Sequence, residues 1–236
     1  MTIALGFHLR RDDAIVLGAD RQITMAASHK YQEDKTTIIW GEGWRVAFVY
    51  AGIPDQMNAL RDRVSELLEG QIPTRKDVKT ILEGSLSELQ QKHRKDFLLQ
   101  TLCAVSVPDG LALLKSDGKL VVQTQSEYLG VGDSSLIRYL DSMFHPSFLT
   151  IPQAIACVTY IIGQANAYID GCFGGPDIVL LSQSAWLRVA GSDDLAKLEG
   201  QMSNLLWVPE QWLDRHLGEF SEKVREFRKQ KEFKWP

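Results

Sequence analysis

The chain has 236 residues, a length that fits one large domain or two small ones. Hydrophobic residues make up 44% and charged residues 24%, which supplies enough apolar side chains for a buried core and excludes a disordered or collagen-like chain. The 26 Lys and Arg against 30 Asp and Glu give a formal net charge of −4, so we expect no nucleic-acid partner.

The chain shows no sign of a membrane span, a secretory signal or a metal site. No apolar run reaches about 18 residues, and the charged stretch from Arg10 to Asp13 interrupts the apolar start. The three cysteines, Cys103, Cys157 and Cys172, have no CxxC spacing and lie among apolar or small residues. We therefore expect buried, reduced thiols in a cytoplasmic protein. The five histidines show no metal-ligand spacing, so we expect no cofactor of that kind.

The first half of the chain predicts two β-hairpins and then two helices. The strand at 14–19 is almost wholly apolar, so we expect it to be buried on both faces. Thr74 and Asp77 are spaced as a capping box at the start of the second helix. The expected elements are strands at 2–9, 14–19, 36–40 and 44–50, and helices at 54–69 and 75–95.

The second half predicts a meander of strands, further helices and one more hairpin. Thr150 is expected to cap a helix that has Gln153 at its third position. The expected strands lie at 97–107, 111–115, 119–124, near 128–129, and at 178–181 and 186–189. The expected helices begin near 133, at about 151 and in the tail, at 193–206 and 210–230.

This order of elements predicts an α+β fold. Antiparallel strand blocks alternate with helix pairs, which indicates a four-layer αββα sandwich in which helices cover both outer faces of two stacked sheets. We expect one domain at 2–190 and a C-terminal helical extension at 191–236. The tail carries an apolar helical stripe that includes Leu213, Leu217 and Phe220. Such a stripe docks either on its own core or on a neighbouring subunit.

Several polar residues could carry chemistry, although each is ordinary when taken alone. If Met1 is removed, Thr2 becomes the N-terminus and offers both a hydroxyl nucleophile and an α-amine, whose reference pKa of about 7.7–8.0 lets it act as a base. Asp20 follows a strand, and Lys35 begins the next hairpin. Gly52 lies at a strand-to-helix corner, where its backbone N–H could meet an oxyanion.

Together, and in this order, these residues resemble the proteasome β-subunit and HslV peptidase family of N-terminal nucleophile hydrolases. The resemblance covers about residues 2–190, and it is the ordered conjunction that is specific. The landmarks are Thr2 to Gly6, Ala19-Asp20 to Thr24, Lys35, Ala51-Gly52 to Asp55, Gly130-Val131-Gly132, and Asp170 before Gly174-Gly175.

The resemblance implies an N-terminal nucleophile hydrolase fold and a threonine-type peptidase or amide hydrolase. It implies that Thr2 is the nucleophile, that Lys35 favours its alkoxide and that Asp20 orients Lys35. It further implies that Gly52 N–H forms the oxyanion hole and that Asp170 helps to hold the terminal amine. The expected partners are a peptide or other amide substrate, further copies of the chain in a homo-oligomer, and an ATP-dependent unfoldase. No cofactor is implied.

Two departures from the family pattern leave alternatives open. Val131 and Phe173 stand where the family often has serines that help to hold the amine. The alternatives are a non-catalytic, proteasome-like structural subunit and a small-amide amidohydrolase with the same chemistry. Extended tails also occur in Anbu-type bacterial relatives, but the N-terminal region of this chain does not closely resemble that branch.

Overall fold

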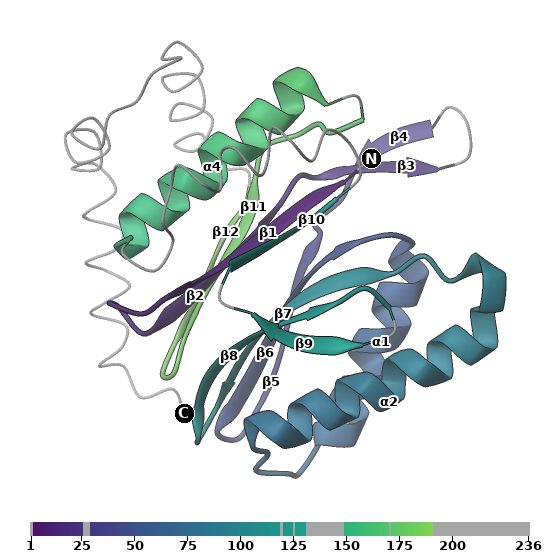
Figure 1. Cartoon of the computed structure of the whole chain (residues 1–236), viewed down its shortest axis with the longest axis vertical. Helices are drawn as coiled ribbons and strands as arrows, with labels where there is room; N and C mark the ends of the chain where they lie inside the picture. The colour runs from purple at the N-terminus through teal and green to yellow at the C-terminus, as the bar shows by residue number, and fades with distance from the viewer. Residues whose placement is uncertain are drawn as a thin grey trace.

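Two five-stranded antiparallel sheets, stacked face to face, form the centre of the molecule (Figure 1). The strand orders are β10-β1-β2-β11-β12 and β5-β6-β7-β8-β9. The computed structural model describes residues 2–25, 29–118, 120–124, 126–130, 149–169 and 171–190. The expected helix near 133 and the C-terminal extension at 191–236 lie outside these residues.

The first sheet is assembled from both ends of the described chain. All six residues of β2 are buried, as the apolar run predicts, and β2 lies between β1 and β11. The short strand expected near 128–129 is present as β10, but it pairs with β1 rather than continuing the meander. The strands are β1 (Ile3–Leu9), β2 (Ala14–Ala19), β10 (Ser126–Gly130), β11 (Asp177–Ser182) and β12 (Trp186–Ala190).

The second sheet follows chain order, so the expected hairpin and meander are confirmed. Its strands are β5 (Thr36–Gly41), β6 (Trp44–Ala51), β7 (Gln100–Val107), β8 (Gly110–Ser116) and β9 (Val121–Thr124). A separate two-stranded ribbon, β3 (Gln22–Met25) with β4 (His29–Gln32), extends beyond the sandwich. The sequence analysis did not predict this ribbon.

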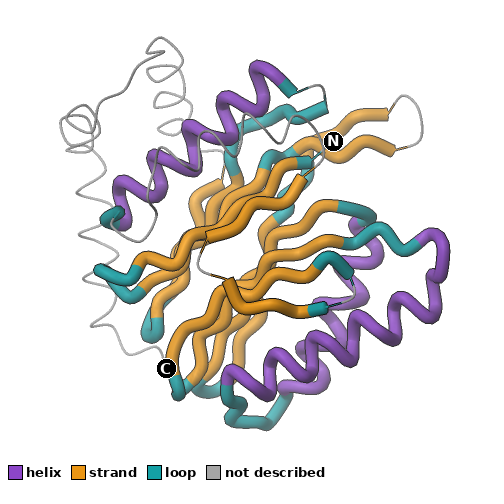
Figure 2. Tube along the Cα trace, in the orientation of Figure 1, coloured by secondary structure: helices purple, strands orange, loops and turns teal. Residues whose placement is uncertain are grey.

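Helices cover both outer faces, so the predicted αββα layering is confirmed (Figure 2). The pair α1 (Pro54–Leu68) and α2 (Arg75–His93) lies on the second sheet, and a short 3₁₀ turn, Arg94–Asp96, follows α2. On the other side, α4 (Ile151–Tyr168) lies on the first sheet. The Asp77 carboxylate accepts from Thr74 N and the Thr74 hydroxyl lies 3.3 Å from Asp77 N, which is the expected capping box. None of the described helices is both apolar and long enough to cross a membrane.

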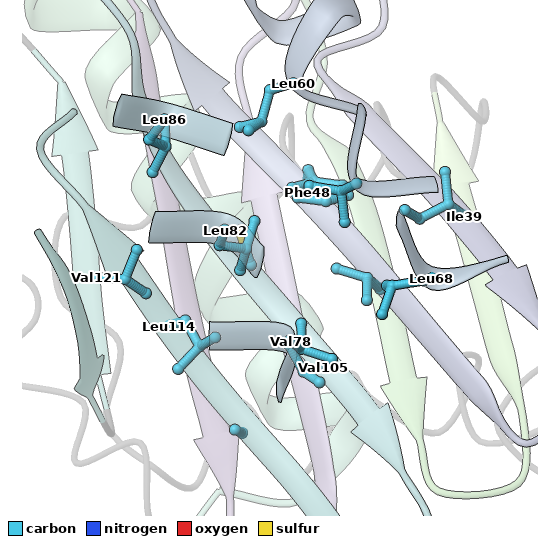
Figure 3. Packing of buried hydrophobic residues seen from close by; sticks show 14 of the residues in the cluster. Ile39, Phe48, Leu60, Leu68, Val78, Leu82, Leu86, Val105, Leu114 and Val121 are labelled. Carbon is cyan, nitrogen blue, oxygen red and sulfur yellow. The ribbon is translucent and has the colours of Figure 1, made fainter. Parts of the chain in front are cut away.

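Three apolar cores separate the four layers, and strand alternation assigns residues to them. In β6, Val46 and Phe48 pack toward α1 and α2, whereas Ala47 and Val49 face the first sheet. Figure 3 shows the first of these cores, where Leu60 of α1 lies near Phe48 and Val78 of α2 lies near Val105. A third core lies between α4 and the first sheet. Both central sheets are therefore covered on two faces. This packing holds in place the strand ends that carry the candidate site.

We expect two glycine substitutions to have opposite effects on stability. A Cβ on Gly18 of β2 would lie 2.2 Å from Val158 Cγ1, so Gly18→Ala should lower the free energy of unfolding by about 1–3 kcal/mol through overpacking. A Cβ on Gly84 of α2 meets nothing within 4 Å, so Gly84→Ala should raise it by about 1 kcal/mol. Urea unfolding curves measure both; wild-type stability of Gly18→Ala would contradict the close approach of α4 to β2.

Candidate active site

Three of the predicted site residues meet in one chain of hydrogen bonds. The Lys35 ammonium donates to the Thr2 hydroxyl, with Nζ and Oγ1 2.8 Å apart. It also donates to the Asp20 carboxylate, with Nζ and Oδ1 3.0 Å apart. The cation thus bridges the hydroxyl and the carboxylate, which are contributed by segments far apart in the sequence.

The β1–β2 hairpin explains why Thr2 and Asp20 are neighbours. Antiparallel pairing places Ala4 opposite Ala19, so the start of β1 and the end of β2 lie at the same end of the first sheet. The Asp20 carboxylate then accepts from Ile3 N at 2.8 Å and from Gln22 N at 3.1 Å. One side chain therefore fixes both the start of β1, beside Thr2, and the turn after β2.

Lys35 precedes β5 of the second sheet, and its side chain reaches these strand ends of the first sheet. The side chain is almost fully buried. Its exposed fraction is 1% and that of Asp20 is 0%, while Thr2 is partly exposed. Burial lowers the pKa of the Lys35 ammonium, and the Asp20 carboxylate opposes that change. Burial likewise raises the pKa of the Asp20 carboxyl, and Lys35 opposes it. Each group is the main reason that the other can stay charged away from water.

Gly52 lies at the end of the second sheet where Lys35 enters β5. The pairing of Thr36 with Val49 places Lys35 level with Tyr50, two residues before Gly52. Gly52 has φ +136°, and a Cβ there would lie 1.8 Å from the carbonyl oxygen of Leu98, so only glycine fits. Among the described residues its N–H has no acceptor, which leaves this donor available to an external oxygen.

A second network, centred on the buried Asp177 and not predicted from the sequence, holds the segment around Lys35. The Asp177 carboxylate at the start of β11 accepts from Thr36 N at 2.9 Å. The Arg188 guanidinium donates to both Asp177 oxygens at 3.1 Å and pairs with Asp34 at 2.7 Å. The residues on either side of Lys35 are thus tied to the first sheet. Asp177 precedes an apolar strand, but its partner is 141 residues away, so no local pattern reveals it.

The segment before β11, which contains Gly174 and Gly175, lies beside the residues that follow β2. A Cβ on Gly174 would lie 3.1 Å from Cβ of Arg21, the residue after Asp20. Cys172 is buried, as expected, and burial, reinforced by the Asp20 carboxylate, raises the pKa of its thiol to about 11. The thiol is therefore neutral at physiological pH. Phe173 is 59% exposed. The predicted residues Asp170 and Val131 lie outside the described residues.

The stacked sheets and the helical outer layers form the four-layer αββα fold that was expected, the fold of N-terminal nucleophile hydrolases. Similar solved structures are Anbu proteins. Anbu from Yersinia bercovieri, described as an ancestral beta-subunit, has a TM-score of 0.72 at 12% identity, covering 88% of this chain and 98% of its own. The helical assembly of the Anbu complex from Pseudomonas aeruginosa gives 0.72 at 13%, covering 89% and 99%.

Anbu from Hyphomicrobium sp. strain MC1 gives 0.71 at 12% identity, covering 86% of this chain and 94% of its own. No protein-family model matches the chain, and no curated protein sequence does. At these identities the likeness establishes the fold. A fold likeness at these identities does not separate one branch from another, so the expectation that the N-terminal region does not closely resemble the Anbu branch stays a prediction. The likeness does not single out HslV-like proteins.

We expect the buried pair to be strongly coupled in stability. Asp20→Asn and Lys35→Met should each lower the free energy of unfolding by about 3 kcal/mol, because each leaves a buried charge without its partner. The double variant should lose clearly less than the sum. Urea unfolding of the three variants measures this coupling. The exposed Arg63–Glu88 pair is the matched control and should show little effect. Additive losses at Asp20 and Lys35 would contradict a mutually dependent pair.

Proposed function

We propose that this protein is a threonine-type amide hydrolase that uses Thr2 as its N-terminal nucleophile once Met1 has been removed. The observation that carries this proposal is the 2.8 Å hydrogen bond from the buried Lys35 ammonium to the Thr2 hydroxyl. A fixed cation beside a hydroxyl stabilises the alkoxide that forms as the proton leaves.

The chemistry requires one proton acceptor and one oxyanion site. The free α-amine of Thr2 takes the hydroxyl proton, and the oxygen attacks the amide carbon to give a tetrahedral oxyanion. The protonated α-amine then gives that proton to the nitrogen of the substrate amide, and the C–N bond breaks. The substrate's amine part leaves, and its acyl part remains as an ester on Thr2. Water, deprotonated by the same α-amine, attacks the ester and releases the acid, so that the hydroxyl is restored.

The remaining residues hold these groups in place. The N–H of Gly52 donates to the developing oxyanion. Two observations support this role: the N–H has no acceptor among the described residues, and Gly52 lies at the end of the second sheet next to Lys35. Asp20 is a positioning residue, since it fixes both Lys35 and the backbone beside Thr2. Asp170 would help to orient the α-amine, a role that rests on the family resemblance alone.

The class of substrate and the assembly follow from the same proposal. A peptide is the amide that this chemistry serves in the resembled family, and a helical assembly is described for the Pseudomonas Anbu complex. We therefore propose peptide substrates and a homo-oligomer, with an ATP-dependent unfoldase as a further partner. A non-catalytic subunit is the alternative, and hydrolysis by the variants below separates the two.

We expect Thr2→Ala to abolish hydrolysis of short fluorogenic peptides, because no hydroxyl remains, whereas Thr2→Ser keeps a measurable rate. Lys35→Met should lower kcat/KM about 10²–10³-fold through loss of the charge beside the alkoxide. The assay compares the variants with wild type, and circular dichroism checks that each is folded. Equal turnover by wild type and Thr2→Ala would contradict the nucleophile, and no turnover by wild type lacking Met1 would favour the structural subunit.

We expect a bell-shaped dependence of kcat/KM on pH. The rate rises as the α-amine loses its proton near its reference value of about 7.7–8.0. It falls at higher pH as Lys35 loses its proton, at a pKa below the ordinary value for lysine because of burial. Asp20→Asn removes the carboxylate that raises the Lys35 pKa, so the falling limb should move to lower pH. A limb that stays in place would contradict Lys35 as its source; thermal unfolding at each pH is the control.

A further inference from the structure

A small cavity opens beside Lys35, where the chain enters β5. Its volume is about 140 Å³, which is room for roughly five waters at about 30 Å³ each. That is too small for a whole drug-sized ligand but suits one side chain. Residues around Lys35, the end of β6 and the first turns of α1 form its walls. Most of the exposed lining is polar, and Tyr50 and Met57, which are 5% and 2% exposed, contribute only a small apolar part.

The cavity lies where a bound substrate places one particular side chain. Its wall includes Lys35, whose ammonium contacts the Thr2 hydroxyl. Its other walls belong to the strand and helix that Gly52 joins. A carbonyl carbon attacked by Thr2, with its oxygen at Gly52 N–H, would therefore lie next to the cavity wall that Lys35 forms. The nearest side chain is that of the residue which contributes the carbonyl, on the acyl side of the scissile amide.

Four charged residues line the cavity, and only one of them lacks an opposite charge. Among the described residues, the Glu33 carboxylate has no ion pair and no hydrogen bond. Its backbone N–H is fixed by Arg21 O at 2.9 Å. The three remaining lining charges are all compensated: Asp34 by Arg21 and Arg188, Lys35 by Asp20, and Arg61 by Asp62. The uncompensated charge of this cavity is therefore negative.

We infer that this cavity binds a basic side chain, lysine or arginine, on the acyl side of the cleaved amide, with Glu33 as the residue that determines the specificity. The inference rests on the proposed function. The aliphatic stem of such a side chain passes the small apolar part of the wall at Tyr50 and Met57, while its charged head reaches Glu33. The resulting charge-assisted hydrogen bond satisfies a carboxylate that otherwise depends on water.

The other two classes of side chain fit the same cavity less well. An acidic side chain would need the Arg61 guanidinium, which already donates to Asp62 at 2.7 and 2.8 Å and to Asn58 at 3.2 Å. It would also face Glu33. A large apolar side chain would displace water from the Glu33 carboxylate without replacing its hydrogen bonds, which is unfavourable.

The test compares four fluorogenic peptides that differ only in the acyl-side residue, which is Arg, Lys, Leu or Glu. Wild type should cleave the Arg and Lys peptides with kcat/KM at least tenfold above that of the Leu peptide. Glu33→Gln removes the charge at nearly constant shape and should lower the Arg-to-Leu ratio about tenfold or more. Glu33→Lys should shift the preference to the Glu peptide. Glu42→Gln, in the turn at the opposite end of β5, is the matched control and should keep the wild-type ratio.

A threonine-reactive vinyl sulfone with glycine at the acyl position separates the two levels of the proposal, because it presents no side chain to the cavity. Thr2 labelling together with a preference for Leu or Glu, or with equal losses for Arg and Leu in Glu33→Gln, overturns the specificity and leaves the hydrolase standing. Absence of both labelling and peptide cleavage overturns the hydrolase, and the specificity with it. Labelling with a Glu33-dependent Arg preference supports both.

Discussion

The buried ion pair of Lys35 and Asp20 is the interaction on which the rest of the site depends. Both side chains are almost wholly buried, so each charge depends on the other for its stability. The pair also joins the two sheets, because Asp20 directly follows β2 of the first sheet and Lys35 directly precedes β5 of the second. The geometry at Thr2 is thus a property of how the sheets stack rather than of one flexible loop.

The cost of burying this pair is offset by surrounding hydrogen bonds. Asp20 accepts two backbone N–H groups in addition to the ammonium, so its carboxylate is well satisfied. Asp177 and Arg188 secure the residues on either side of Lys35, which limits the positions that its side chain can take. A preorganised cation of this kind stabilises a developing alkoxide without reorganising during the reaction. The same rigidity gives the neighbouring cavity a fixed shape, on which side-chain selection depends.

The local features of the fold could be predicted from the sequence because they rest on local physics. Turn residues and apolar alternation located most strands, and the spacings Thr74–Asp77 and Thr150–Gln153 located two helix starts. The ribbon of β3 and β4 was missed because His29–Gln32 is short and polar and shows no apolar alternation. The partner of β10 was not evident either, because pairing between distant strands depends on the whole sheet.

The candidate site was predictable only through the ordered set of landmarks. Thr2, Asp20 and Lys35 are ordinary residues when taken singly, and it is their order along the chain that indicates convergence. Asp177 and the unpaired Glu33 follow no such pattern. The role of Asp177 comes from a contact across 141 residues, and that of Glu33 comes from which neighbouring charges are already paired. Contacts of this kind arise from tertiary packing, which local sequence does not encode in readable form.

The proposed mechanism requires that Met1 is removed and that the hydroxyl of Thr2 is the nucleophile. The most direct measurement is the intact mass of the purified protein before and after reaction with a threonine-reactive probe, followed by mapping of the modified peptide. Before the reaction, we expect a mass lower than that of the full sequence by one methionine. After it, we expect a single adduct on Thr2, and no adduct in Thr2→Ala. A chain that retains Met1 and takes no adduct, or one modified at another residue, would contradict this mechanism.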